Sequence, residues 1–162
     1  MNVPLKYLPK RLTKKDKKKQ AKQLKKSRAA YKKGIYIHRK PVDSYKSKKS
    51  QHILNAERIY NIENLSINNE LANKTGCSIK SLNKIIKKGI GAYYSSGSRP
   101  NQTPHSWGIA RLASSISGGK AAAIDYNILA EGCKSGSKAL KLAKKSRIKN
   151  GYGTHKVVKR KI

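Results

Sequence analysis

Apolar residues recur every three or four positions through the middle of the chain, which is the spacing of one face of an α-helix. The pattern is clear in three segments, SQHILNAERIYN (50–61), SWGIARLASSI (106–116) and AAAIDYNILAEG (121–132). Glycines follow or end the last two of them. A further helix, SKALKLAKKSRIK (137–149), can be capped by Ser135 or Ser137. The pattern therefore predicts a set of short helices.

A helix-turn-helix pattern occupies NNELANKTGCSIKSLNKIIKKG, residues 68–89. Ala72 is a small residue at the point where two helices would touch, and Gly76 suits a left-handed turn. Leu82 and Ile85 would then seat the second helix on the first. A helical corner with no role in DNA binding gives the same pattern, so both interpretations stay open.

The second helix of this pattern is predicted to run from Ile79 to Lys88, capped by Ser78 and ended by Gly89. Thr75, in the first helix, stands where such motifs more often have an apolar residue. The side chains expected to contact a nucleic acid or another polyanion are Lys80, Ser81, Asn83, Lys84, Lys87 and Lys88, together with Arg99 from the following loop.

The N-terminal region is rich in lysine. Residues 1–12, with two prolines, are expected to form a short extended arm. Thr13 then resembles a helix N-cap with Asp16 three residues later, which predicts a helix over 14–33 that ends at Gly34. The apolar face of this helix is thin, so lysine repulsion should leave it mostly unfolded unless it lies on phosphates or on an acidic protein surface.

The expected fold class is mainly α, with a small helical core that contains the helix-turn-helix-like hairpin and the helices after it. Residues 1–50 would form a basic N-terminal arm, 51–132 the core domain, and 133–162 a basic C-terminal helix and tail. Only IYIH (35–38) and HKVV (155–158) resemble strands.

Charge separates the same three regions. The chain has 39 Lys and Arg, 7 Asp and Glu, and a formal net charge of +32. The N-terminal 50 residues carry 19 basic and 2 acidic residues, the next 82 carry 9 and 5, and the last 30 carry 11 and none. So large an excess of one sign repels itself, and it predicts a polyanionic partner such as nucleic acid, an anionic membrane surface or an acidic protein face.

The two cysteines, Cys77 and Cys133, do not form a CxxC pair, so we expect neither a disulfide framework nor a cysteine zinc site. This usage favours a reduced intracellular setting. No apolar run approaches the roughly 20 residues of a membrane span, and the N-terminus lacks the apolar segment of a signal peptide.

Catalytic motifs are absent from the sequence. SGGKA (117–121) resembles part of a phosphate-binding loop, but Ser114 replaces its first glycine and Ala121 its metal-binding hydroxyl. The four histidines lack the spacing of metal ligands. We therefore expect a protein that is not an enzyme, with no cofactor, metal or small-molecule substrate.

The stretch with the most distinctive composition is GAYYSSGSRPNQTPHSWG, residues 91–108, which is rich in glycine, proline, serine and aromatic residues. Its glycines and prolines favour a rigid structural corner, and its aromatic residues would clamp that corner to the helices. A polyanion or partner contact around Arg99 is the alternative, with catalysis a distant third. The residues expected to shape the loop are Gly91, Tyr93, Tyr94, Gly97, Pro100 and Trp107.

The stretch KKGIGAYYSSGSRPNQTPHSWGIARLASSISGGKAAAIDYNIL (87–129) resembles a domain family of large double-stranded DNA viruses of algae and protists, phycodnavirus-like, with no established activity. The resemblance covers about 70–132 and leaves out both basic arms. The residues that carry it are Gly89, Gly91, Tyr93, Tyr94, Ser98, Arg99, Pro100, Trp107, Gly108, Ala110, Arg111, Gly118, Gly119, Lys120 and Asp125.

This resemblance implies a viral setting and, with the charge, a structural virion protein. The first hypothesis is a minor capsid protein on the inner face of the capsid, made in the host cytoplasm or nucleus, whose basic arms staple capsid subunits and offset negative charge. Its partners would be other capsid proteins, the major capsid protein above all, with genomic DNA or an anionic inner membrane as further partners. The alternative is a DNA-binding or genome-condensing protein that uses the helix-turn-helix-like element and the arms.

Overall fold

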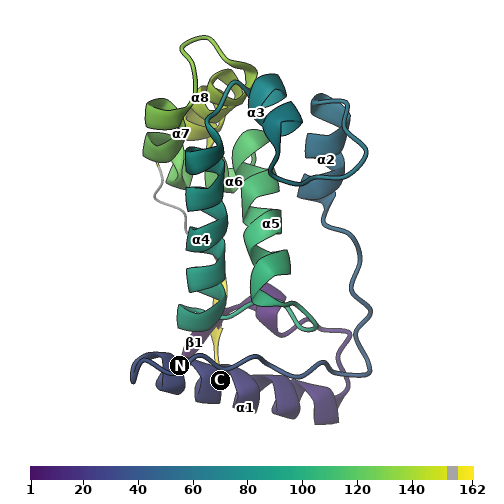
Figure 1. The fold of residues 1–162 in the computed structure, drawn as a ribbon. Coiled ribbons are helices and arrows are strands. Elements are labelled where there is room, and N and C mark those ends of the chain that lie inside the picture. The colour runs from purple at the N-terminus through teal and green to yellow at the C-terminus, as the bar shows by residue number, and fades with distance from the viewer. Residues whose placement is uncertain (153–156) are drawn as a thin grey trace. The chain divides into compact units, whose positions relative to one another are not determined.

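The computed structural model describes residues 1–152 and 157–162. Helices dominate these residues (Figure 1), so the mainly α prediction is confirmed. In chain order the elements are β1 (Asn2–Pro4), the 3-10 helix η1 (Leu5–Tyr7), α1 (Lys14–Tyr31), α2 (Gln51–Ile59), α3 (Asn69–Thr75), α4 (Ile79–Ser95), α5 (Pro104–Ile116), α6 (Lys120–Ile124), α7 (Tyr126–Gly132), α8 (Lys138–Asn150) and β2 (Lys159–Lys161).

The described residues form two compact units. The terminal unit contains Met1–Lys48, Ile90–Trp107 and residues 157–162, and the central unit contains Lys49–Gly89 and residues 108–152. This division differs from the expected arm, core and tail, because the terminal unit combines both ends of the chain with the loop region.

The terminal unit has a hydrophobic core of its own. Its buried residues are Val3, Tyr7, Leu8, Leu12, Leu24, Val42 and Tyr45, and Met1, Ala21, Trp107 and Ile162 pack against them. β1 pairs antiparallel with β2, with Val3 opposite Arg160. Residues 1–12 are therefore packed and do not form the expected free arm, because their few apolar side chains meet partners far away in the sequence.

α1 begins as predicted, since the Thr13 hydroxyl accepts a hydrogen bond from the Asp16 backbone N–H. The helix ends at Tyr31, slightly before the predicted end, and Gly34 follows with a left-handed φ of 75°. Ser44 donates two hydrogen bonds to the Asp16 carboxylate, one from its hydroxyl and one from its backbone, and these lower the pKa of Asp16 below its usual value.

The two segments expected to resemble strands form none where they are described. Residues 35–38 are irregular, with Ile35 and Tyr36 exposed. In HKVV, residues 155 and 156 lie outside the described residues, while Val157 and Val158 precede β2.

In the central unit, α4 and α5 pass close together where Gly89 meets Gly108. A Cβ added to Gly89 would lie 2.6 Å from the Gly108 Cα, closer than carbon atoms can approach. The prediction that the second helix ends at Gly89 is wrong, because α4 continues to Ser95. Gly89 is required by the close approach of α5 and does not stop the helix.

The segment 121–132, predicted to be one helix, is divided at Asp125 into α6 and α7. The buried Asp125 carboxylate accepts hydrogen bonds from Arg111, Lys88 and Ser115. Burial alone would raise the pKa of Asp125, but hydrogen bonds and positive charge from Arg111, and then from Lys88, lower it below its usual value. This carboxylate therefore ties α4 and α5 to the junction of α6 and α7.

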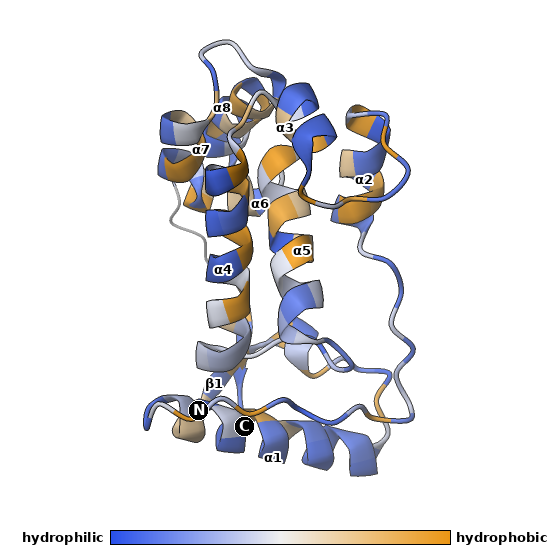
Figure 2. Cartoon of the chain, viewed as in Figure 1, coloured by the Kyte–Doolittle hydropathy of each residue, from blue (hydrophilic) through white to orange (hydrophobic). Residues whose placement is uncertain are grey.

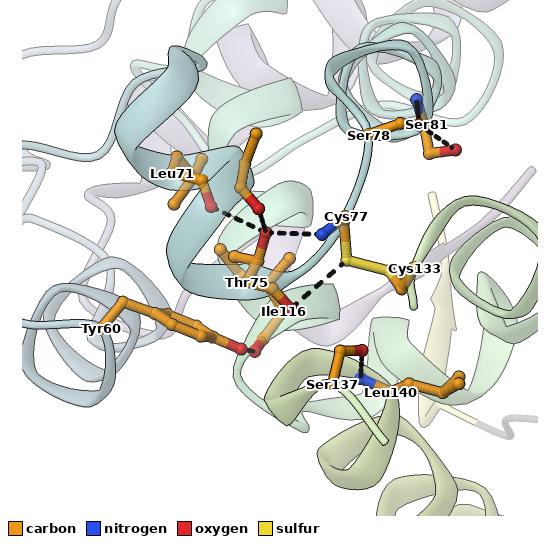
Figure 3. The surroundings of a disulfide bond; sticks show 11 residues. Tyr60, Leu71, Thr75, Cys77, Ser78, Ser81, Ile116, Cys133, Ser137 and Leu140 are labelled. Carbon is orange, nitrogen blue, oxygen red and sulfur yellow. Dashed lines mark hydrogen bonds between the residues drawn. A yellow bond between two sulfur atoms is a disulfide. The ribbon is translucent and has the colours of Figure 1, made fainter. Parts of the chain in front are cut away.

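Cys77 and Cys133 form a disulfide in the central unit (Figure 3), so the sequence argument against a disulfide is wrong for this pair. The Ser78 N–H donates to the Gly132 carbonyl and the Lys134 N–H to the Gly76 carbonyl, each at 2.8 Å. These bonds hold residues 132–134 beside the turn between α3 and α4. A separation of 56 residues carries no sign of this contact in the sequence.

The residue before α8, Ser137, accepts a hydrogen bond on its hydroxyl from the Leu140 N–H, so Ser137 and not Ser135 is the cap. Ala139, Leu140 and Ala143 are buried on its inner face. In the part of the chain that the structure describes, none of the helices has the length and apolar character needed to cross a bilayer.

Candidate nucleic-acid interface

The turn between α3 and α4 has the geometry that the sequence predicts. Gly76 adopts a left-handed conformation with φ of 77°, and its N–H donates to the Ala72 carbonyl. A Cβ on Gly76 would lie 2.6 Å from the Ser137 Cβ, so packing against the start of α8 adds a second reason for glycine here. Ser78 caps α4 by accepting a hydrogen bond from the Ser81 N–H.

Thr75 is compatible with this turn although it is polar. The side chain is fully buried, and its hydroxyl donates to the Leu71 carbonyl at 2.7 Å (Figure 3). The same oxygen accepts a hydrogen bond from the Cys77 N–H at 3.2 Å. Because both of its hydrogen-bonding roles are satisfied, threonine can occupy a position where an apolar residue is more common.

The inner face of α4 seats the helix in the core. Leu82 and Ile85 are fully inaccessible and Ile86 is nearly so. Figure 2 shows the apolar side of α4 turned toward α5 and the polar side turned away from it. The packing therefore determines which side of α4 faces the core and which side chains face solvent.

Four of the side chains predicted to contact a polyanion lie on this outward face. Lys80, Asn83, Lys84 and Lys87 are all exposed. Asn83 and Lys84 are neighbours, and each lies three or four residues from Lys80 and from Lys87, which places all four along one side of the helix. None of these three lysines forms an ion pair with any Asp or Glu that the structure describes.

The other two predicted contacts on α4 have internal roles. Ser81 is half-buried, and its hydroxyl lies where a Cβ on Gly132 would clash. Lys88 is exposed along part of its length, but its ammonium forms an ion pair with Asp125 at 3.1 Å. These two side chains support the fold, and the free basic face is smaller than the sequence predicts.

Arg99 belongs to the terminal unit, where it is exposed in the loop between α4 and α5. Around it, the loop residues contact the core of that unit. Tyr93 is fully buried, Tyr94 bonds through its hydroxyl to the His38 ring at 2.8 Å, and the Trp107 ring meets Tyr7 edge to face.

The remaining residues predicted to shape the loop differ in how closely they are packed. Gly97 has a φ of 115°, and a Cβ there would lie 2.7 Å from Leu24. Pro100 is buried, whereas Gly91 lies inside α4 with open space where a side chain would be. Most of the loop is thus a structural corner of the terminal unit, and Arg99 is its exposed cation.

Arg39 is a central residue of the terminal unit that the sequence does not reveal. Its guanidinium lies 3.8 Å from the centre of the Tyr93 ring and donates to the Ser27 hydroxyl, the Tyr93 carbonyl and the Ser98 hydroxyl. Burial lowers the pKa of Arg39 below its usual value. Because its acceptors come from α1, α4 and the loop, no local pattern around Arg39 could have identified it.

α1 forms a second basic surface, in the terminal unit. Its inner face buries Asp16, Gln20, Leu24 and Ser27. Its exposed lysines are Lys14, Lys15, Lys18, Lys19, Lys22, Lys25 and Lys26, and Figure 2 shows this helix as mostly hydrophilic. No described acidic side chain forms an ion pair with any of them.

The described residues contain no group of three or more His, Cys, Asp or Glu side chains that could hold a metal ion. The groups exposed at these surfaces are lysine ammonium groups, the Asn83 amide on α4 and the Arg99 guanidinium in the loop. Such groups bind phosphate oxygens and the edges of bases.

The fold and these surfaces define a small, strongly basic, mainly α protein with a helical core. The chain belongs to a family of unknown function, DUF5824, which matches residues 4–130. The match begins in the N-terminal segment, which the resemblance drawn from the sequence leaves out, and it includes parts of both units. No curated protein and no solved structure matches the chain.

Proposed function

We propose that this protein binds double-stranded DNA and presents the exposed face of α4 to the duplex. One observation supports this function most directly. Leu82, Ile85 and Ile86 of α4 are buried. The N-terminus of α4 follows a turn like that of a helix-turn-helix, and the side chains left in solvent include Lys80, Asn83, Lys84 and Lys87. In helix-turn-helix proteins the second helix lies in the major groove and its N-terminal residues contact the bases.

The lysine face of α1 supports a contribution from phosphate contacts. Lysines four residues apart on a helix repel each other, and each such pair costs about 0.2–0.5 kcal/mol. The segments of the terminal unit carry 22 Lys or Arg and 2 Asp, a net charge of +20. Phosphates would relieve this repulsion and release counterions from the DNA, so binding should weaken steeply as salt rises.

The experiment is a fluorescence-anisotropy titration of a labelled duplex with the full chain between 50 and 300 mM salt. The variant Lys80→Ala/Lys84→Ala/Lys87→Ala should bind more than about tenfold more weakly and lower the salt slope by about 2 to 3. The matched control is Lys141→Ala/Lys144→Ala/Lys145→Ala, which removes three exposed lysines from α8.

The control variant should stay within about threefold of the unmodified chain. Equal losses in both variants would mean that net charge alone attracts the DNA and that α4 is not the contact surface. If the unmodified chain shows no binding even at low salt, the proposed function itself is wrong.

A structural role in a virion, as a minor capsid protein of a large double-stranded DNA virus, is our second proposal. The concentration of charge in the terminal unit favours it, because such a unit could offset negative charge on an inner capsid face. Residues 1–48 are folded, so the unit as a whole would contact the major capsid protein in place of free arms. Mass spectrometry of purified particles, with and without nuclease, tests this role: retention with the DNA-free shell supports it, and absence from particles excludes it.

A further inference from the structure

The exposed face of α4 contains two side chains that are not cations. Ile79, the first residue of the helix, is 38% exposed, and Asn83 lies one turn later on the same side. Lys80, Lys84 and Lys87 flank them along the helix. An apolar side chain and an amide thus lie side by side at the N-terminal end of the helix, within a row of ammonium groups.

These two side chains match the edges of an A·T base pair. An asparagine amide can bond to both N6 and N7 of adenine, and an apolar side chain can contact the 5-methyl group of thymine. Lysines on phosphates add affinity but no sequence information. α4 has no arginine, which together with lysine is the residue that reads guanine in the major groove.

The position of the pair in the fold supports the same assignment. The turn at Gly76 and the Ser78 cap define the start of α4, where Ile79 and Lys80 are exposed. The N-terminal residues of a recognition helix are the ones that reach bases. Ser81, the other polar residue of this first turn, packs against Gly132 and is not free to read a base. Ile79 and Asn83 are therefore the two uncharged side chains of α4 best placed for base contact.

We propose that the protein prefers A·T over G·C base pairs in the major groove, with Asn83 bound to adenine and Ile79 packed on the thymine methyl group. This preference rests on the proposed function of α4 as the DNA-contacting helix. The ligand class is A·T-rich duplex DNA, and the two residues determine specificity.

Three duplexes of equal length test the preference with the full chain at one salt concentration. The first contains only A·T pairs, the second only G·C pairs, and the third replaces every thymine of the first with uracil, which lacks the methyl group. Each duplex presents a single kind of pair in every register, so no binding site needs to be known beforehand. The A·T duplex should bind roughly tenfold more tightly than the G·C duplex.

Variants then separate the two contacts. Replacing thymine with uracil should weaken binding severalfold for the unmodified chain and have no effect on Ile79→Ala. Asn83→Ala should remove most of the preference for A·T pairs while binding to the G·C duplex stays within about twofold. The matched controls are Ile148→Ala and Asn127→Ala, which change an exposed isoleucine and an exposed asparagine on other helices.

The outcomes distinguish failure of the base preference from failure of the proposed DNA binding on which it rests. Absence of binding to all three duplexes contradicts DNA binding as a whole. Tight binding with equal affinity for A·T and G·C, or a uracil effect that persists in Ile79→Ala, overturns the base preference and leaves DNA binding intact. A preference for G·C pairs, through lysine contacts to guanine, also overturns it.

Discussion

At the scale of single residues, two charged groups organise the protein, the buried Asp125 carboxylate and the half-buried Arg39 guanidinium. Asp125 joins three cationic or hydroxyl donors in the central unit, and Arg39 joins three oxygens in the terminal unit. The Arg39 acceptors are neutral, whereas Asp125 is balanced by charge. Both groups are costly to bury alone, so each must keep its partners for its unit to fold.

Asp125→Asn should lower the free energy of unfolding by about 3 kcal/mol, because it leaves the half-buried Arg111 without its carboxylate. Lys88→Ala should cost much less, since the Lys88 side chain is 46% exposed and water can replace its bond. Urea denaturation at pH 7 measures both. Equal costs for the two variants would contradict this ranking.

The pH dependence follows from the lowered pKa of Asp125. A carboxyl whose folded pKa is depressed stabilises the fold above its unfolded pKa of about 4, and that contribution is lost as pH falls from there through the folded pKa. Stability of the unmodified chain should therefore drop below about pH 4 more than that of Asp125→Asn. Thermal melting from pH 7 to pH 2.5 checks this, and parallel curves for the two proteins would contradict it.

At the scale of elements, the two glycines inside α4, Gly89 and Gly91, have different structural roles. Gly89 faces the Gly108 backbone, whereas Gly91 has nothing within 4 Å of the position of a Cβ. The sequence shows both as breaks in a helical pattern, yet neither ends the helix. Whether a glycine is required at each position depends on whether another helix packs against it.

Gly91→Ala should stabilise the protein by about 0.5–1 kcal/mol, because alanine favours the helix and fits the open space. Gly89→Ala should destabilise it by about 1–3 kcal/mol despite the same gain in helix propensity, because its methyl group would clash with α5. Differential scanning calorimetry of the two variants provides the comparison. Stabilisation by both substitutions would show that α4 and α5 can separate at no cost.

At the scale of the whole molecule, the two units have separate cores and different covalent support. The disulfide between Cys77 and Cys133 lies entirely in the central unit. The terminal unit relies on packing, on the pairing of β1 with β2 and on Arg39. Loss of the disulfide should therefore affect the two units unequally.

Reduction of the disulfide should lower the stability of the central unit by about 2–4 kcal/mol, because it frees a loop of 56 residues in the unfolded chain. Hydrogen exchange followed by mass spectrometry should show lost protection in α3, α4 near its start, and α8, while α1 keeps its protection. Cys77→Ser/Cys133→Ser is the control and should match the reduced protein. An equal loss of protection in α1 would mean that the units unfold together.

Local sequence chemistry predicts much of the central unit. The cap at Ser78, the left-handed turn at Gly76 and the outward positions of Lys80 and Lys84 all follow from residue type and helical spacing, whereas the choice of Ser137 over Ser135 needed the structure. These features depend on neighbours within one or two helical turns. For the same reason, most of the exposed face of α4 is visible in the sequence.

By itself, the sequence determined the mainly α class, the places where most helices begin and the excess of positive charge, because each depends on residue type and on spacing within a few positions. Only the tertiary structure decided that both ends of the chain share a core with the loop and that Cys77 meets Cys133. It also decided that Ser81 packs against Gly132 and that the Lys88 ammonium pairs with Asp125. Those outcomes depend on which apolar and polar groups meet across tens of residues. Such long-range contacts depend on how the whole chain packs, and they produce no periodic pattern in the sequence.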